Sequence, residues 1–268
     1  MDNALRLKQP QTALITGASS GLGYEFSQLF AQDRYNLVLV ARNEQKLSQL
    51  ANDLISRFSI AVKIIVKDLS DLASPEEIFT ELQQDGIAVD ILVNNAGFAT
   101  YGFFSEIDLP TELQMMQVNI VTLTHLTKLF LREMLKRKSG KILNIASTAA
   151  FLPGPLMAVY YATKAYVLSF SEAIANEVQG SGVTVTVLCP GPTESGFQKR
   201  AAMEQSKLVK GRKIPDAATV AKAGYRALMR NQTILVPGLA NQLQTFSIRF
   251  LPRSFVRQTV RNMQKRND

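Results

Sequence analysis

The sequence of 268 residues contains one cysteine, one histidine and no tryptophan. The single cysteine, Cys189, cannot form a disulfide within the chain, and directly before Pro190 it is interpreted as a small buried apolar residue. The histidine, His125, lies in a predicted long helix without an acidic or cysteine partner at ligand spacing, so no metal site is indicated. Sparse cysteine is typical of a reducing compartment, and we expect a cytoplasmic protein.

Long hydrophobic runs are also missing from this sequence. No stretch approaches the roughly 18 apolar residues that cross a bilayer. No early segment combines a charged start, an apolar stretch and a small-residue cleavage site. The sequence therefore predicts a soluble chain, bound at most to the surface of a membrane.

Acidic residues are fewer than basic ones, 22 against 30, and the net charge is +8. Two late segments hold this excess: residues 193–213 carry six cations and two anions, and residues 249–268 carry six cations and one anion. A nucleic-acid binder would more often show a basic face with interleaved aromatic residues, or a known module. Neither is present, so we expect no nucleic-acid partner.

Apolar runs of strand length alternate with helical patterns along the whole chain, as in repeated βαβ units. The predicted strands are residues 12–16, 36–41, 61–66, 89–93, 141–146, 183–188 and 233–236. The clearest helices are 110–136 and 160–178, each followed by a glycine that can stop it, Gly140 and Gly180. We expect an α/β fold of the Rossmann type, a doubly wound, seven-stranded parallel sheet with helices on both faces. The expected organisation is a single domain over residues 1–268, with a basic lid at about 193–213 and a basic amphipathic extension at about 240–268.

A glycine-rich turn, residues 16–23 (TGASSGLG), follows the first predicted strand and leads into a helix. Gly17 suits a tight turn, while Gly21 and Gly23 allow the backbone and the helix to approach closely. The free N–H groups of the helix start can then bind a pyrophosphate. A purely structural turn is the alternative interpretation.

The residues at the end of the second predicted strand indicate whether the site prefers NAD(H) or NADP(H). A site for NAD usually offers a carboxylate to the ribose hydroxyl, whereas an arginine accommodates a 2′-phosphate. Arg42 stands here and no acid precedes it, so NADP(H) is preferred and NAD(H) remains open. Asp68, before Leu69 at the end of the third strand, can bind an adenine amine or simply form a turn.

Tyr160 and Lys164 lie four residues apart at the start of a predicted helix, on one face. With seven tyrosines in the chain this spacing alone is weak support, but the pair follows the fifth strand on the side of the sheet where a cofactor should lie. A nearby ammonium lowers the pKa of a tyrosine, so Tyr160 can exchange a proton. Ser147, after the fifth strand, can bond a carbonyl oxygen or form a simple turn.

Several motifs together resemble the short-chain dehydrogenase/reductase family over nearly the whole chain. They are the glycine turn, Asn94-Asn95-Ala96-Gly97, Asn119, Ser147, Tyr160-Tyr161-Ala162-Thr163-Lys164 and Pro190-Gly191. The resemblance implies that Tyr160 is the acid/base, that Ser147 orients the carbonyl, and that Lys164 tunes Tyr160 and binds the nicotinamide ribose. It also implies that Asn119 holds a helix kink and a water of the proton relay, and that Asn94 supports the sheet.

The expected cofactor contacts follow from this reading. They are Gly17, Ser19, Ser20, Gly21, Leu22, Gly23, Arg42, Asp68, Leu69, Asn95, Ala96, Gly97, Tyr160, Lys164, Pro190, Gly191 and Thr193. Many members that prefer NADP carry a basic residue where this chain has Ser20, so the preference rests on Arg42.

Residues 98–104 and 151–159 are expected to face the substrate. They contain Phe98, Tyr101, Phe103, Phe104, Leu152, Leu156 and Met157, which favour an apolar carbonyl or alcohol, although core packing explains some of them equally well. The basic lid that follows is either a solvated segment or a contact for an anionic handle such as an acyl-CoA or an acyl-carrier protein.

The basic tail places Arg249, Arg253, Arg257, Arg261 and Lys265 at steps of four, between Phe246, Phe250, Leu251, Phe255, Val256 and Val260. Pro252 is expected to divide it into two helices. The apolar face either lies on an anionic membrane or packs on its own domain or a sister subunit. The resemblance implies a homodimer or homotetramer.

The sequence thus predicts an NADP(H)-dependent reductase of an apolar ketone or 3-oxoacyl compound, with Tyr160 as general acid/base. One alternative is a hydroxysteroid-type alcohol dehydrogenase working oxidatively. Another, of a different class, is a dinucleotide-binding regulator without turnover.

Overall fold

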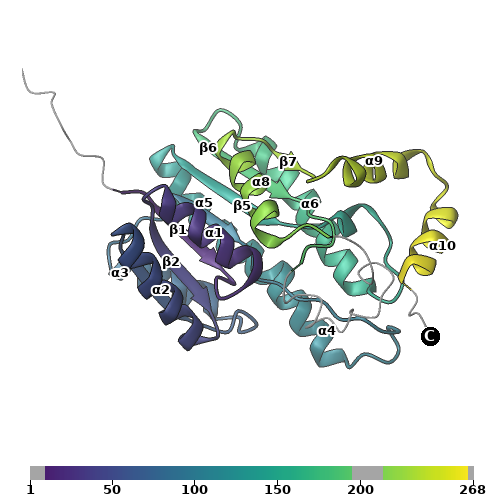
Figure 1. Ribbon diagram of the computed structural model, residues 1–268, viewed down its shortest axis with the longest axis horizontal. Coiled ribbons are helices and arrows are strands. Elements are labelled where there is room, and N and C mark those ends of the chain that lie inside the picture. The colour runs from purple at the N-terminus through teal and green to yellow at the C-terminus, as the bar shows by residue number, and fades with distance from the viewer. Residues whose placement is uncertain (1–9, 195–213, 265–268) are drawn as a thin grey trace, which may run out of the picture.

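A computed structural model describes residues 10–194 and 214–264. All seven predicted strands are present, and they form one parallel sheet in the order β3-β2-β1-β4-β5-β6-β7 (Figure 1). Their bounds are β1 Thr12–Thr16, β2 Asn36–Ala41, β3 Val62–Val66, β4 Ile91–Asn94, β5 Gly140–Ile145, β6 Val183–Leu188 and β7 Ile234–Leu235. The predicted doubly wound, seven-stranded fold is confirmed, and strand order reverses between β1 and β4.

Helices cover both faces of this sheet because neighbouring strand residues point in opposite directions. On β1, Ile15 packs in a core cluster with α1 (Gly21–Gln32), α2 (Glu44–Phe58) and α8 (Ala217–Met229). Leu14 packs on the other side with α3 (Ser74–Gln84), α5 (Leu123–Arg137) and α6 (Ala158–Glu177). Buried on both faces, the strands read as continuous apolar runs.

The long helix predicted for residues 110–136 is interrupted. The structure divides it into α4 (Leu109–Met116), a π-helical segment (Gln117–Thr122) and α5. The predicted stop at Gly140 is wrong, because Lys138 already takes the left-handed conformation (φ 53°) and Gly140 begins β5. Gly180 does adopt a positive φ, 78°, just after α6.

The tail forms two helices, as the position of Pro252 predicted. α9 (Leu239–Ser247) runs into a short 3₁₀ turn, and α10 (Arg253–Gln264) begins after the proline. Both helices lie at one end of the molecule, apart from the helices that cover the sheet (Figure 1). In the described ranges, no helix has the length and apolar character that a membrane crossing requires.

Candidate functional site

The carboxyl ends of the strands border a cavity of about 1170 Å³, next to the reversal of strand order. Parallel sheets place ligand sites at this position. With two exceptions, Gly23 and Asn119, every residue that the sequence assigned to catalysis or cofactor binding lines the cavity. The sheet therefore brings together residues that lie as far apart in the chain as Gly17 and Thr193.

The glycine turn forms one end of the cavity and requires its glycines. Gly17 and Gly21 have positive φ values of 65° and 56°. Gly23 points away from the cavity, where a Cβ atom would stand 2.3 Å from the carbonyl oxygen of Gly17. The helix start can approach the first strand only without that side chain. Gly21 and Leu22 of the first turn of α1 line the cavity, the position that a phosphate site at a helix start requires.

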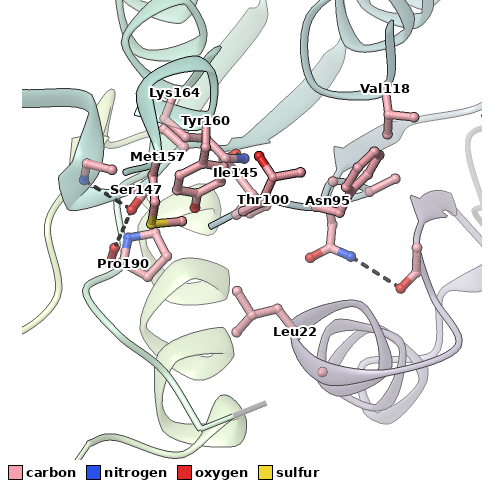
Figure 2. Close-up of a pocket in the computed structure, with 18 of the residues that line it drawn as sticks. Leu22, Asn95, Thr100, Val118, Ile145, Ser147, Met157, Tyr160, Lys164 and Pro190 are labelled. Carbon is pink, nitrogen blue, oxygen red and sulfur yellow. Dashed lines mark hydrogen bonds between the residues drawn. The ribbon is translucent and has the colours of Figure 1, made fainter. Parts of the chain in front are cut away.

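Asn95 holds this turn from the neighbouring strand. Its Nδ2 donates to the carbonyl oxygen of Thr16 at 2.8 Å, and the hydroxyl of Thr16 accepts the main-chain N–H groups of Asn95 and Ala96, each at 3.0 Å. Figure 2 shows Asn95 directed at the turn, where its Nδ2 also donates to the carbonyl oxygen of Gly17 at 3.3 Å. The loops after β1 and β4 are thus tied together across the reversal of strand order.

Asn94, one residue earlier, points into the sheet instead. Its Nδ2 donates to Thr127 at 3.0 Å and to Asn144 on β5 at 2.9 Å, and Asn144 donates to Ser171 of α6 at 2.9 Å. This buried chain of polar side chains joins β4 and β5 to α6 below the cavity.

The other side of the glycine turn is basic. Arg42 lies 3.7 Å from Asp68, and both side chains are largely exposed. Lys46 and Lys67 line the same end, which the sequence analysis missed. The usable signal for Lys46 was its position in the first turn of a helix that starts just after Arg42.

Asp68 serves as a turn former, one of the two expected interpretations. Its Oδ1 accepts the Ser70 N–H at 3.0 Å and the Ser70 hydroxyl at 2.8 Å. Burial alone would raise the pKa of Asp68, but the hydrogen bonds from Ser70 and the charge of Arg42 leave this pKa lowered. The carboxylate is therefore ionised at neutral pH beside Arg42.

Tyr160, Lys164 and Ser147 meet in the middle of the cavity. Figure 2 shows them side by side on α6 and at the end of β5, with Leu22 pointing towards them from the start of α1. The Lys164 Nζ donates to the carbonyl oxygen of Ile145 at 2.8 Å and lies 5.8 Å from the centroid of the Tyr160 ring. The Ser147 hydroxyl donates to the Pro190 carbonyl oxygen at 3.3 Å. It also accepts the Ala149 N–H at 3.1 Å, and this second contact is the turn that the sequence offered as the alternative.

Burial changes the proton affinity of two of these side chains. It raises the pKa of Tyr160, and a hydrogen bond with Ser147 lowers this pKa by less, so the phenol keeps its proton at neutral pH. Burial also lowers the pKa of Lys164 to about 8. The expected lowering of the tyrosine pKa by the ammonium is therefore not found, because desolvation dominates and Lys164 bonds to Ile145 rather than to the phenol.

Asn119 lies behind the cavity lining, in the π-helical segment, and is buried. Its Nδ2 donates to the Phe98 carbonyl oxygen at 3.0 Å and to the Thr163 hydroxyl at 3.1 Å, and its Oδ1 accepts the Phe98 N–H at 3.2 Å. A Cβ on Gly97 would come within 2.9 Å of that Oδ1. Asn119 thus fixes the loop after β4 against α6, at the residue directly before Lys164.

The apolar end of the cavity contains four of the expected substrate-facing residues, Phe98, Tyr101, Leu152 and Met157. The expectation is not met for Phe103, Phe104 and Leu156, which lie outside the lining. Phe103 and Phe104 are exposed because the chain turns outward before α4 begins.

The tail supplies the remaining wall of this apolar end, which the sequence analysis missed. Asn241, Gln244, Val260 and Met263 line it. The i, i+4 spacing of Val256 and Val260 was the available signal, since both side chains are buried against the domain.

Two hydrogen bonds fasten the end of α10 to the cavity. The Gln264 Nε2 donates to the Tyr161 hydroxyl at 2.6 Å, and the Tyr101 hydroxyl donates to the Gln264 carbonyl oxygen. The Gln264 side chain is fully buried, and its Oε1 has no hydrogen-bond partner among the described residues. The tail is therefore part of the cavity wall and is held against the domain.

The remaining expectations fall outside the cavity. Most of the basic lid at about 193–213, from residue 195 onward, lies outside the described residues. His125 contacts Glu76 on α3 at 3.3 Å. Cys189 is buried, and burial raises the pKa of its thiol to about 12. Within residues 10–194 and 214–264, no group of three or more His, Cys, Asp or Glu side chains could hold a metal ion.

Comparisons with known proteins agree with this architecture. A family model described as short chain dehydrogenase matches residues 11–206. The very-long-chain 3-oxoacyl-CoA reductase of Anas platyrhynchos is 32% identical over 66% of this chain and 58% of that protein. The 17-beta-hydroxysteroid dehydrogenase type 3 of Mus musculus is 35% identical over 67% of this chain and 59% of that protein. The chain thus spans about three fifths of the length of these two relatives.

A solved structure is similar over almost the full length. The short-chain dehydrogenase from Sphingobium yanoikuyae, in complex with NADPH, superposes with a TM-score of 0.82 and 28% identity, covering 96% of this chain and 98% of the other. The glycine turn after β1, the polar cluster around Tyr160 and the matching family model lead to one conclusion: this chain belongs to the short-chain dehydrogenase family.

Proposed function

We propose that this chain is an NADP(H)-dependent oxidoreductase that reduces an apolar ketone or 3-oxoacyl-type compound, within a single catalytic domain. One observation carries the proposal. A single cavity joins the glycine turn, the three side chains Tyr160, Lys164 and Ser147, and an apolar chamber. A proton donor thus lies between a dinucleotide cradle and a space for an apolar substrate.

The residues at the basic end fit a phosphorylated dinucleotide. The glycines of the turn pack so closely on the neighbouring backbone and on Asn95 that Cβ atoms would clash there. A hydrogen bond from Asn95 holds the turn in place. Arg42, with Lys46 beside it, offers positive charge to a 2′-phosphate, and the NADPH complex of the Sphingobium relative supports this choice. When bound, the nicotinamide supplies the hydride. We propose that the other expected cofactor contacts also bind the dinucleotide directly. Gly23 does not line the cavity, and its role is to let the helix start approach the first strand.

The chain's own residues then handle the proton. Tyr160 Oη donates its proton to the carbonyl oxygen of the substrate, and the Ser147 hydroxyl orients that oxygen. The raised pKa of Tyr160 supports its role as a proton donor, because the acid form is the one present at neutral pH. Lys164 binds the cofactor ribose, and Asn119 positions the loop beside the relay.

The chamber lining supports an apolar substrate. Phe98, Leu152, Met157 and Val260 contribute apolar surface. The 3-oxoacyl-CoA reductase relative supports a 3-oxoacyl compound. The hydroxysteroid dehydrogenase relative supports the second candidate, an alcohol dehydrogenase working oxidatively, because the same residues serve both directions.

The proposed partners follow from the surface. We propose a homodimer or homotetramer through the long helices, supported by the exposed apolar side chains Val121, Leu135 and Tyr166 on the π-helical segment, α5 and α6. The basic residues of 193–213 are proposed to attract an anionic handle such as an acyl-CoA or an acyl-carrier protein. A cytoplasmic location is proposed on the single buried cysteine.

A screen of NADPH oxidation across ketones, 3-oxoacyl thioesters and quinones, with NADH run in parallel, tests the activity. Tyr160→Phe should lower kcat by a factor of about 10² to 10⁴ and leave the Kd for NADPH unchanged. Tyr166→Phe, on the exposed side of the same helix, is the matched control. Turnover retained in Tyr160→Phe contradicts the mechanism, and NADPH binding without turnover of any compound favours the regulator.

A further inference from the structure

Helix α9 presents its apolar side chains outward. Leu239, Leu243 and Phe246, together with Phe250 of the following 3₁₀ turn, recur at helical spacing and share one face. These four side chains are between 59% and 77% exposed. Soluble helices place such a stripe against the core, so this face requires an explanation.

The opposite face of α9 is the one that contacts the domain. Thr245 is buried, and Asn241 lies against Gly191, where a Cβ would come within 2.7 Å of the Asn241 Nδ2. The same Nδ2 donates to the Pro237 carbonyl oxygen at 2.7 Å, and the Thr245 hydroxyl donates to the Asn241 carbonyl oxygen at 3.0 Å. The close approach of Asn241 to Gly191 and the burial of Thr245 place this face of the helix against the domain, so the apolar stripe faces outward as part of the fold.

Positive charge accompanies the stripe. Four arginines, Arg249, Arg253, Arg257 and Arg261, follow it at steps of four, and all are exposed. No aspartate or glutamate occurs between Pro237 and Gln264. On α10, Val256 and Val260 are buried against the domain, so that face packs on its own core, while Phe255 is exposed.

We propose that the outward face of α9 and the four exposed arginines that follow it in the chain bind the surface of an anionic membrane. Leucine and phenylalanine side chains enter the boundary between headgroups and acyl chains, while arginines contact lipid phosphates. A second copy docked through the same face would bring the two sets of arginines together, which like-charge repulsion opposes. An acidic protein surface would pair with the arginines but would offer no apolar surface to the stripe on α9.

The location gives this surface a role in substrate supply, a step that rests on the proposed function. Asn241 and Gln244 of α9, with Val260 and Met263 of α10, form one wall of the substrate chamber. The proposed membrane face and the chamber wall are therefore two sides of the same helices. An apolar substrate dissolved in the bilayer would be delivered next to the chamber instead of crossing water.

Vesicle flotation tests the proposal with the full-length chain. Vesicles of phosphatidylcholine with roughly a third phosphatidylglycerol are compared with pure phosphatidylcholine at low and high salt. We expect binding to the anionic vesicles that weakens with salt. Phe246→Ser/Phe250→Ser and Arg253→Glu/Arg257→Glu should each lower this binding at least about tenfold.

Ile55→Ser/Leu72→Ser removes two exposed apolar side chains elsewhere, from α2 and the loop before α3, and is the matched control. All variants should keep the wild-type Tm and the wild-type molar mass in light scattering. Three results overturn the proposal: no binding at low salt, equal binding to neutral and anionic vesicles, or a change in molar mass as the main effect of the α9 substitutions. Vesicle binding can be measured on Tyr160→Phe, which needs no turnover. A lack of vesicle binding is therefore distinguishable from a lack of the proposed enzymatic activity.

Discussion

The contact between Gln264 and Tyr161 predicts a measurable coupling between the tail and the substrate chamber. Among the described residues, Tyr161→Phe removes the one hydrogen-bond partner of the fully buried Gln264 amide nitrogen, and the Oε1 of the same amide has no partner there. Leaving a buried donor unsatisfied costs about 1–3 kcal/mol. Gln264→Met removes that donor and the unpartnered oxygen together at nearly constant volume, but it leaves the buried Tyr161 hydroxyl without this partner, so its own cost should also be about 1–3 kcal/mol.

In the Gln264→Met background there is no amide for Tyr161→Phe to leave without a partner, so this substitution should lower the stability of the tail only slightly. The coupling energy in the double-mutant cycle is therefore expected at about 1–3 kcal/mol, or about 5–150-fold in the opening equilibrium of α10. Hydrogen–deuterium exchange of the α10 amides measures this equilibrium. Because Val260 and Met263 line the chamber, KM for a large apolar substrate should rise with opening while kcat changes less.

Tyr101→Phe is the matched control for this cycle. Its hydroxyl donates to the main-chain oxygen of Gln264, which no side-chain substitution removes. Its effect on α10 exchange should therefore be the same with Gln264 and with Met at that position. Equal effects of Tyr161→Phe in the two backgrounds would refute the coupling.

Three further predictions concern the cofactor end. Arg42→Ala should raise the Kd for NADPH by about tenfold in fluorescence titration, a modest factor because the side chain is largely exposed, and an equal loss for NADH would contradict this. Since burial lowers the pKa of Lys164 to about 8, the ammonium is lost as pH rises through that value, and kcat/KM for NADPH should fall above about pH 8. In Lys164→Met, kcat/KM for NADPH should be low at every pH and should not fall further above about pH 8. If the fall persists in this variant, another group causes it. Gly23→Ala places a Cβ 2.3 Å from the Gly17 carbonyl oxygen, so urea unfolding should show a loss of about 1–3 kcal/mol, and unchanged stability would contradict the close packing.

Local pattern was sufficient for the sheet and for the main residues of the site. Strands buried on both faces read as apolar runs, and the turn after β1 needs glycine for reasons of backbone conformation alone. The order of the strands in a doubly wound fold then places the loops after β1, β4 and β5 at one edge. The positions of the glycine turn, Asn95, Ser147 and Tyr160 around one cavity were therefore predictable before any coordinates.

Tertiary structure decided what depends on environment and on distant contacts. The direction of the Tyr160 pKa shift follows from burial, which a sequence spacing does not contain. The outward turn of Phe103 and the inward position of Met263 depend on how separate segments pack. The tail shows this most directly. Its sequence has apolar residues on both α9 and α10. Only side-chain contacts determine that Val260 of α10 lines the chamber, whereas Leu239, Leu243 and Phe246 of α9 face outward.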